Sequence, residues 1–442
     1  MRKAISFLIA AIVLAGIFFV LRSALPKYTG FLPFFLILLL LDVYLWYSVK
    51  NNFSPKKTAI KYLVIGLYWF PLMLLVSSIV SGFAVPFREW NIPYRTYLMG
   101  FVTTAYVSKF IFIIFLFISD VIRILQFGFL AVIRRSGIKF NEIRRLKSLI
   151  IPGWIFGTGF FLLLMCGMVF WNFDFRIKQE TIRLPELPAS FNGTRIIQVS
   201  DIHLGNWGCP EKLRKAVEII NSEDPDIVFF TGDMVNYTSY EAYEFANILK
   251  EIKAPFGIYA IMGNHDYGDY VAWPSPEAKR KNLDYLNEIY KYMGWKLLLN
   301  EHIIIHHGSD SIAVIGVENW GGTKRFPRLG DLDKATKGTE NMAVQLLLTH
   351  DPSHWEKIVK KEFKNIDITF SGHTHGFQFG LECFGIRWSP SQYIYNEWAG
   401  LYCEPVSGSH PQYLYVSRGL GSVGYPGRIG ILPEITLIIL KK

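Results

Sequence analysis

Cysteine is scarce in this chain, and its few copies show no metal-binding spacing. The 442 residues contain four cysteines, and no two of them form a CxxC pair. This spacing argues against a zinc site framed by cysteines. Cys166 lies in an apolar stretch, where we interpret it as inert packing. Pairing of Cys383 with Cys403 stays open, because it requires an oxidising compartment.

The chain also lacks the glycine-rich loops that hold nucleotide phosphates. It contains neither a Walker loop nor a Rossmann fingerprint, which argues against the nucleotide-binding folds built on those loops. No internal repeat is evident, so a solenoid or a propeller is not indicated.

Acidic residues are rare in the first part of the chain. Residues 1–175 hold 18 lysines and arginines but only five acidic residues, whereas residues 176–442 hold 28 and 31. The formal charge of +10 therefore arises in the amino-terminal part. We interpret it as a signal of membrane topology and expect no nucleic-acid partner.

Residues 1–175 form a predicted membrane region of about five helices. Each apolar stretch is long enough to cross about 30 Å of hydrocarbon as a helix. The first is preceded by Arg2 and Lys3, as in a signal peptide, but no A-x-A cleavage site follows it, so we favour an uncleaved span. The predicted spans are residues 4–21, 31–49, 62–85, 97–122 and 149–171.

The basic residues of the connecting loops predict the orientation. The loops between the second and third spans and between the fourth and fifth spans are rich in lysine and arginine, and the other two are poor. Loops rich in lysine and arginine stay in the cytoplasm. An odd number of spans then places residues from about 172 onward on the extracytoplasmic side of the plasma membrane. One span more or fewer would invert this side.

Residues 176–442 have the pattern of a separate α/β domain. Residues 176–193 are a predicted linker with a lead-in strand, and residues 194–442 alternate strands with helices. This order predicts an α/β sandwich of mixed sheets flanked by helices. The apolar spacing predicts helices at 212–221, 240–252 and 282–293 and strands at 295–300, 302–306, 311–317, 413–417 and 435–440.

Five short apolar runs each end in side chains that bind metals. Taken singly, these polar groups are common at strand ends, but their joint occurrence is not. Buried strands deliver such groups to one edge of a sheet, where they can hold two divalent metals. The groups are Asp201-Ile202-His203, Gly232-Asp233, Gly263-Asn264-His265-Asp266, His350 and Gly372-His373-Thr374-His375.

Four longer motifs give residues 190–440 a family resemblance. The motifs are GNHDY at 263–267, LLxHxP at 347–352, SGHTHG at 371–376 and VSRGLG at 416–421 followed by Arg428. This part of the chain resembles the calcineurin-like metallophosphoesterase superfamily, and in particular its membrane-associated bacterial branch. Asn236 and Phe377 depart from the family pattern, but neither departure removes a ligand.

The resemblance implies a role for each polar group. Asp201, His203 and His375 would bind the first metal, and Asn264, His350 and His373 the second. Asp233 would bridge both, since a carboxylate can join two cations that repel each other. The imidazoles suit Mn, Fe, Zn or Ni.

Three further residues have predicted roles beside the metals. His265 would act on the phosphate or the leaving oxygen. Asp266 would orient His265 or cap a helix. Arg418 is a candidate for binding the phosphate of a substrate.

Together, these features predict a metal-dependent phosphohydrolase in a multi-pass membrane protein. Its substrate would be a phosphoester or pyrophosphate, either a small molecule or a lipid, because a tether raises the local concentration of a lipid-phase substrate. One alternative is a UDP-2,3-diacylglucosamine pyrophosphatase, whose cytoplasmic substrate conflicts with the predicted orientation. The other is a non-catalytic membrane receptor, although all seven ligand positions are filled.

Overall fold

The computed structural model describes residues 16, 32–49, 58–85, 87–133, 145–323, 326–383, 385–405 and 411–442. The chain divides into two compact units. One consists of Met1–Pro86 with Phe101–Leu162, and the other of Phe87–Gly100 with Leu163–Lys442. Two long helices therefore contribute residues to both units.

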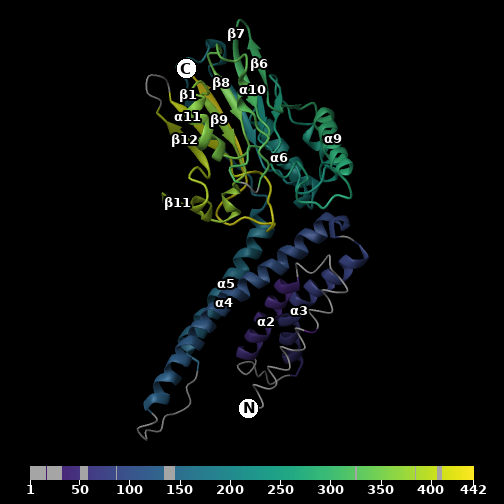
Figure 1. Ribbon diagram of the computed structural model, residues 1–442, viewed down its shortest axis with the longest axis vertical. Helices are drawn as coiled ribbons and strands as arrows, with labels where there is room; N and C mark the ends of the chain where they lie inside the picture. The colour runs from purple at the N-terminus through teal and green to yellow at the C-terminus, as the bar shows by residue number, and fades with distance from the viewer. Residues whose placement is uncertain are drawn as a thin grey trace. The chain divides into compact units, whose positions relative to one another are not determined.

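The first unit is built from apolar helices. Three helical stretches are long and apolar enough to cross a membrane, Thr58–Gly82, Ile92–Phe129 and Lys147–Trp171, and Pro33–Ser48 is a shorter one. They correspond to four predicted spans, whereas the predicted span at 4–21 falls outside the described residues except for Gly16. The helices are α2 (Leu32–Val49), α3 (Thr58–Ala84), α4 (Ile92–Ile133) and α5 (Lys147–Cys166) (Figure 1).

Charged side chains within these helices pair with one another. Lys109 Nζ of α4 lies 2.6 Å from Asp42 Oδ1 of α2, and Arg145 donates two hydrogen bonds to Asp120. A buried charge in an apolar setting requires such a partner. We therefore interpret both pairs as contacts between segments that hold the helical unit together.

The second unit contains two six-stranded sheets. Sheet A has the order β1-β14-β2-β3-β4-β5 and sheet B the order β12-β13-β9-β8-β7-β6, and β10 and β11 form a separate hairpin. Both large sheets mix parallel and antiparallel pairs. In sheet A the strands are β1 (Arg176–Arg183), β2 (Arg195–Val199), β3 (Ile227–Phe230), β4 (Ile258–Ala260), β5 (Lys296–Leu297) and β14 (Glu434–Lys441). In sheet B they are β6 (Glu301–His307), β7 (Asp310–Gly316), β8 (Gln345–Leu348), β9 (Ile368–Ser371), β12 (Gly400–Glu404) and β13 (Gln412–Val416), and the hairpin is β10 (Leu381–Cys383) with β11 (Ile386–Trp388).

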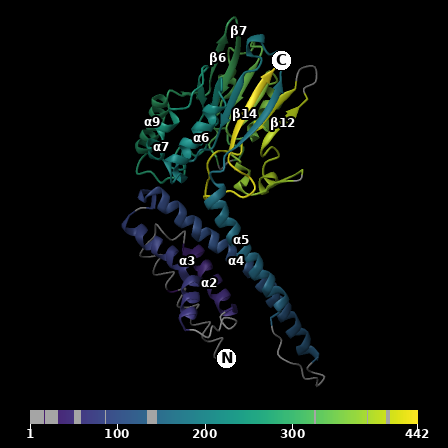
Figure 2. The ribbon, with the colours of Figure 1, turned by 180° about the vertical axis from the view of Figure 1, so that it is seen from behind.

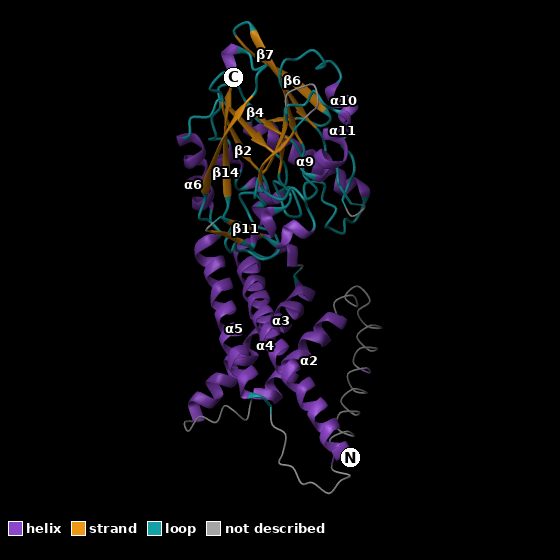
Figure 3. Cartoon of the chain, turned by 90° about the vertical axis from the view of Figure 1, so that its left-hand side faces the viewer, coloured by secondary structure: helices purple, strands orange, loops and turns teal. Residues whose placement is uncertain are grey.

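The main core lies between the two sheets. Ile196 and Phe229 of sheet A pack with Leu346 and Phe370 of sheet B in one buried cluster. Two further clusters lie between the outer face of each sheet and its helices. The central strands are thus buried on both faces, which explains their continuous apolar runs. Figures 2 and 3 show the resulting layers of helix and strand.

The predicted mixed sheets flanked by helices are confirmed. The sheet A side carries α6 (Pro210–Ser222), α8 (Ala246–Leu249) and α9 (Pro276–Met293), and α10 (Leu332–Thr336) covers sheet B. The lead-in segment forms β1, which pairs with β14 at an edge of sheet A. The remaining short helices are α7 (Tyr240–Tyr243) and α11 (Lys360–Glu362).

Two details differ from the prediction. The predicted helix 240–252 is divided into α7 and α8. In addition, α9 begins six residues before the predicted start, because Ser275 caps it by accepting a hydrogen bond from the backbone amide of Ala278. The four cysteines are all unpaired, so the structure contains no Cys383–Cys403 bond.

Candidate metal centre and active site

The predicted ligands follow the carboxyl ends of strands in both sheets. β2, β3 and β4 are parallel neighbours in sheet A, and β8 and β9 are parallel neighbours in sheet B. The carboxyl ends of parallel neighbours meet at one edge, which is where open α/β folds place their sites. After these strands come Asp201 and His203 (β2), Asp233 (β3), Asn264 (β4), His350 (β8), and His373 and His375 (β9).

The backbone at this edge adopts a conformation that is rare for residues with a side chain. Nine described residues other than glycine have a positive φ, and five of them are predicted ligands. Each such residue typically costs about 1–3 kcal/mol, and strain of this kind concentrates at functional sites. The sharp turns aim several side chains from short loops at one point. The five are Asp201, His203, Asp233, His373 and His375, with φ between 50° and 72°.

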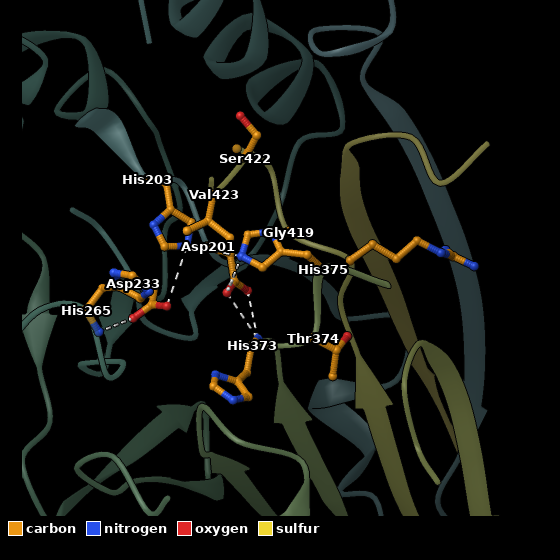
Figure 4. A network of polar contacts seen from close by, with 12 residues as sticks. Asp201, His203, Asp233, His265, His373, Thr374, His375, Gly419, Ser422 and Val423 are labelled. Carbon is orange, nitrogen blue, oxygen red and sulfur yellow. Dashed lines mark hydrogen bonds and ion pairs between the residues drawn. The ribbon is translucent and has the colours of Figure 1, made fainter. Parts of the chain in front are cut away.

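One group of ligand atoms joins the two sheets. His203 Nε2 lies 3.1 Å from His375 Nε2, and His375 Nε2 lies 3.3 Å from Asp201 Oδ1. The ligand atoms of these three residues all lie within 4.8 Å of one another. They are the three residues predicted to bind the first metal (Figure 4).

A second group lies beside the first and shares Asp233 with it. His350 Nε2 lies 3.2 Å from Asp233 Oδ2 and 3.2 Å from His373 Nδ1. Asp233 Oδ2 also lies 3.6 Å from His203 Nε2 of the first group. The carboxylate of Asp233 therefore lies between the two groups, in the position predicted for a bridge.

The residues fit divalent metals by the chemistry of their donor atoms. Asn264 Oδ1 is buried without a hydrogen-bond partner. Buried polar atoms in proteins are nearly always paired, so this oxygen is available to a cation. The contacts of imidazole nitrogens with carboxylates and with each other also suit cations between them. Asn264 as a ligand stays a prediction, because its oxygen is only shown to be unpaired.

Burial and mutual charge shift the pKa values of the ligands. Burial would raise the pKa of Asp233, but His350 and His265 outweigh burial and hold that pKa well below its ordinary value. Burial lowers the pKa of His203 and His373, which favours their neutral, ligating form. Burial also acts to lower the pKa of His350, yet Asp233 and Asp201 raise that pKa to about 10. A metal that binds His350 would therefore displace a proton.

Backbone groups hold two of these side chains in place. His350 Nδ1 lies 2.7 Å from the carbonyl oxygen of Thr231. Because a carbonyl only accepts, Nδ1 carries a proton, and Nε2, which faces Asp233, is the nitrogen that would bind a metal after losing its own proton. The carboxylate of Asp201 accepts the backbone amide of His373 at 3.0 Å and 3.1 Å, which links the loops after β2 and β9.

Asp266 holds the backbone of two loops at the centre. Its buried carboxylate accepts four amides, those of Asp233, Met234, Val235 and Gly263. Three of these amides lie in the loop that carries the bridging aspartate, and that of Gly263 lies in the turn that carries His265. Orientation of the His265 ring by Asp266 stays a prediction. Burial, with the charge of Asp233, raises the pKa of Asp266 to about 7.

His265 is oriented by two groups that sequence reasoning missed. Its Nδ1 lies 2.8 Å from the carbonyl oxygen of Asn236, and its ring stacks on Tyr270 with centroids 4.3 Å apart. The carbonyl fixes the proton on Nδ1 and leaves Nε2 for the centre, where His265 groups with His203 and Asp233. A backbone carbonyl has no residue signature, so no sequence pattern indicates this partner.

Arg418 and Arg428 both lie between β13 and β14, and Arg428 is the one that contacts the centre. Arg418 is buried between the carboxylates of Glu434 and Glu382, so its predicted role in substrate binding would require one of these pairs to open. Arg428 is fully buried, with Nη2 lying 3.5 Å from His375 Nδ1. Arg428 also donates to several carbonyls of its own loop, including that of Gly421.

Comparison with known families agrees with this geometry in both parts of the chain. The family described as calcineurin-like phosphoesterase matches residues 194–377. The family described as probable calcineurin-like phosphoesterase, transmembrane domain, matches residues 27–171. The transmembrane match ends with the last candidate span, and residues 172–193 separate it from the phosphoesterase match.

Three individual relatives carry the names of metallophosphoesterases or of a pyrophosphatase. The metallophosphoesterase YkuE of Bacillus subtilis is 32% identical over 268 residues, which cover 60% of this chain and 84% of YkuE. A metallophosphoesterase of Helicobacter pylori is 26% identical over 417 residues, covering 92% of this chain and 97% of the relative. The UDP-2,3-diacylglucosamine pyrophosphatase LpxG of Chlamydia muridarum is 28% identical over 284 residues, covering 54% and 81%.

Two sheets flanked by helices, with clustered carboxylates and imidazoles at one edge, define a metal-dependent phosphoester hydrolase. The chain belongs to the calcineurin-like phosphoesterase family, in a form that carries its own transmembrane domain. This confirms the resemblance and the enzyme class.

Proposed function

We propose that this protein is a membrane-bound phosphohydrolase with a binuclear metal centre, and that it cleaves a phosphoester or pyrophosphate bond in a lipid-linked substrate. The lipid assignment rests on the position at which the membrane-spanning helices join the catalytic unit. Residues Phe87–Gly100 and Leu163–Trp171 belong to that unit, and each contains one end of a candidate membrane span.

These two span ends contact the loops that surround the metal centre. In the loop after His203, Gly208 packs against Pro93 and Tyr97 of α4. In the loop between β13 and β14, the amide of Arg428 lies 3.3 Å from the carbonyl oxygen of Gly167. The Tyr425 hydroxyl in the same loop donates to the carbonyl oxygen of Leu164. The edge of the sheets that carries the ligands is thus also the edge where the spans attach, which favours a substrate at the membrane surface.

The residues have complementary parts in the proposed reaction. The two divalent metals that such sites hold supply an activated water and neutralise phosphate charge. Asp233 and the imidazoles would hold the cations, and Asp201 ties the two loops together through the amide of His373. In its doubly protonated form, with Nδ1 bonded to the carbonyl of Asn236, His265 would donate a hydrogen bond or a proton from Nε2 to the leaving oxygen.

The test uses the purified full chain in detergent, loaded in turn with Mn²⁺, Fe²⁺, Zn²⁺ and Ni²⁺. We expect hydrolysis of detergent-dispersed lipid phosphates or lipid diphosphates to exceed that of water-soluble phosphomonoesters. The D233N variant serves as the inactive control. Equal or better activity on the water-soluble esters would overturn the lipid assignment while leaving the hydrolase intact.

UDP-2,3-diacylglucosamine is the specific second candidate, favoured by the similarity to LpxG. It belongs in the same substrate panel, and selective cleavage of its pyrophosphate bond would support this candidate. Metal analysis addresses the receptor alternative in the same preparation. Fewer than about one metal per chain and no hydrolysis would favour a binding role.

A further inference from the structure

Glu241 is a buried carboxylate with no part in the metal centre. Its side chain is 5% exposed, and Oε2 accepts the backbone amides of Asn236 at 2.6 Å and Tyr237 at 3.2 Å. These amides belong to the loop after Asp233. A carboxylate that accepts two amides fixes the direction of the peptide groups that donate them.

The loop that Glu241 holds is the one that orients His265. The carbonyl of Asn236 receives the Nδ1 proton of His265 at 2.8 Å, and the amide of the same residue is bound by Glu241. The fit around this contact is close. A Cβ placed on Gly205, in the loop after His203, would lie 2.5 Å from Glu241 Oε2 and 2.6 Å from Asn236 Oδ1, so the pair has little room to shift.

Glu241 is in turn held by Arg95 at the start of α4. Arg95 Nη2 lies 3.3 Å from Glu241 Oε1, and both side chains are buried, at 7% and 5% exposure. Arg95 lies within the candidate span Ile92–Phe129. A buried ion pair with one partner removed leaves an uncompensated charge, so each residue constrains the other.

We propose that Glu241 is a positioning residue for His265, that it acts through the backbone of Asn236, and that Arg95 anchors it to the first turn of a membrane span. A continuous set of contacts then runs from the span to the nitrogen that faces the phosphate. This inference rests on the hydrolase activity but not on a lipid substrate.

The experiment therefore uses a soluble chromogenic phosphodiester and the full chain in detergent. We expect E241A to lower kcat by about 10- to 100-fold, in the range of the contacts that orient a catalytic group, with KM within about twofold. Metal content should not change. The control is E244A, which removes an exposed carboxylate next to the end of α7 and should leave kcat unchanged.

A double mutant separates positioning from general structural damage. If Glu241 acts only through His265, E241A should have no further effect in an H265A background, because the group that it positions is absent. Equal losses in both backgrounds, or an unchanged kcat in E241A, would overturn the proposal. If E241A does not fold, E241Q replaces it in the same comparison, since it keeps an acceptor for the amides and should retain more activity.

Arg95 gives a second, independent readout. R95Q should lower kcat in the same direction but by less, because the amides of Asn236 and Tyr237 still hold Glu241. R95K, which keeps the positive charge, should restore most of the loss. An unchanged kcat in R95Q would show that Arg95 does not anchor Glu241. The proposal would then apply to Glu241 only.

Discussion

Asp233 has the largest number of roles of any side chain in the centre. Its carboxylate lies between the two ligand groups, and it also accepts the backbone amide of His265 at 2.8 Å. We expect D233N to lower both metal content and hydrolysis by more than about 100-fold, above the losses that follow from removing a partner behind a ligand. Metal analysis of the purified chain beside the activity assay measures both. Full metal content with normal turnover would show that Asp233 is not a bridge.

The protonation of His354 predicts how stability depends on pH. His354 is buried beside Trp320, with Nδ1 lying 3.0 Å from Thr349 Oγ1, and burial lowers its pKa to about 3. Between pH 6.5 and pH 3 the unfolded state binds a proton that the folded state does not, so stability falls as the pH falls. From pH 7 to pH 5 this group alone removes about 2 kcal/mol.

The measurement is the thermal midpoint of the full chain at pH 7 and pH 5, with chelator present so that metal release does not contribute. The midpoint of H354Q should fall less between the two pH values than that of the natural chain. Equal falls in both proteins would show that His354 does not set this dependence.

At the scale of the residue, chemistry was predictable from sequence but orientation was not. Asp233, His350 and His373 were identifiable because their residue types and their places after apolar runs indicate metal binding, and the structure brings them together. The partner of the His265 ring was not predictable, because Asn236 contributes its carbonyl and not its side chain. The same holds for Asp266, whose partners are backbone amides.

Among the elements, the turn after β4 has little room for a side chain at its glycine. A Cβ on Gly263 would overlap Asp233 Oδ1 and lie 2.7 Å from the amide nitrogen of Asp233. We expect G263A to displace the bridging carboxylate and to lower activity by about 100-fold, the effect of a misplacement of about 1 Å. A loss of about 1–3 kcal/mol in stability should accompany it.

Gly159 of α5 provides the control for this substitution, since a Cβ there meets no atom within 4 Å. G159A should leave activity unchanged. Normal metal content and activity in G263A would show that the turn can move away from the added methyl group.

The elements themselves were predicted with uneven success, for physical reasons. The apolar spacing located α6 (Pro210–Ser222), because one face of this helix is buried on sheet A. The first turns of α9 carry Glu277, Lys279 and Arg280, so they have no apolar spacing, and only the cap at Ser275 marks the start. Pairing of β1 with β14 joins strands more than 250 residues apart, which a local pattern does not specify.

For the whole molecule, the positive charges of one loop predict which side of the membrane carries the catalytic unit. The segment 130–146 joins the candidate spans Ile92–Phe129 and Lys147–Trp171. It holds five basic residues and one acid, and Arg123 and Lys147 add two positive charges at the adjoining span ends. Basic loops remain in the cytoplasm. The opposite ends of both spans, Phe87–Gly100 and Leu163–Trp171, belong to the catalytic unit. This orientation depends on one loop and not on the total number of spans.

We therefore predict that residues 172–442 lie on the extracytoplasmic side. A phosphatase reporter that folds only outside the cytoplasm should be active when fused after Lys442, and a fluorescent reporter that folds only inside should be dark there. Fusions of the same reporters after Lys139, within the basic loop, should give the inverse result. A bright fluorescent fusion after Lys442 would place the catalytic centre in the cytoplasm. It would also move UDP-2,3-diacylglucosamine, a cytoplasmic substrate, ahead of the lipid phosphates of the outer leaflet.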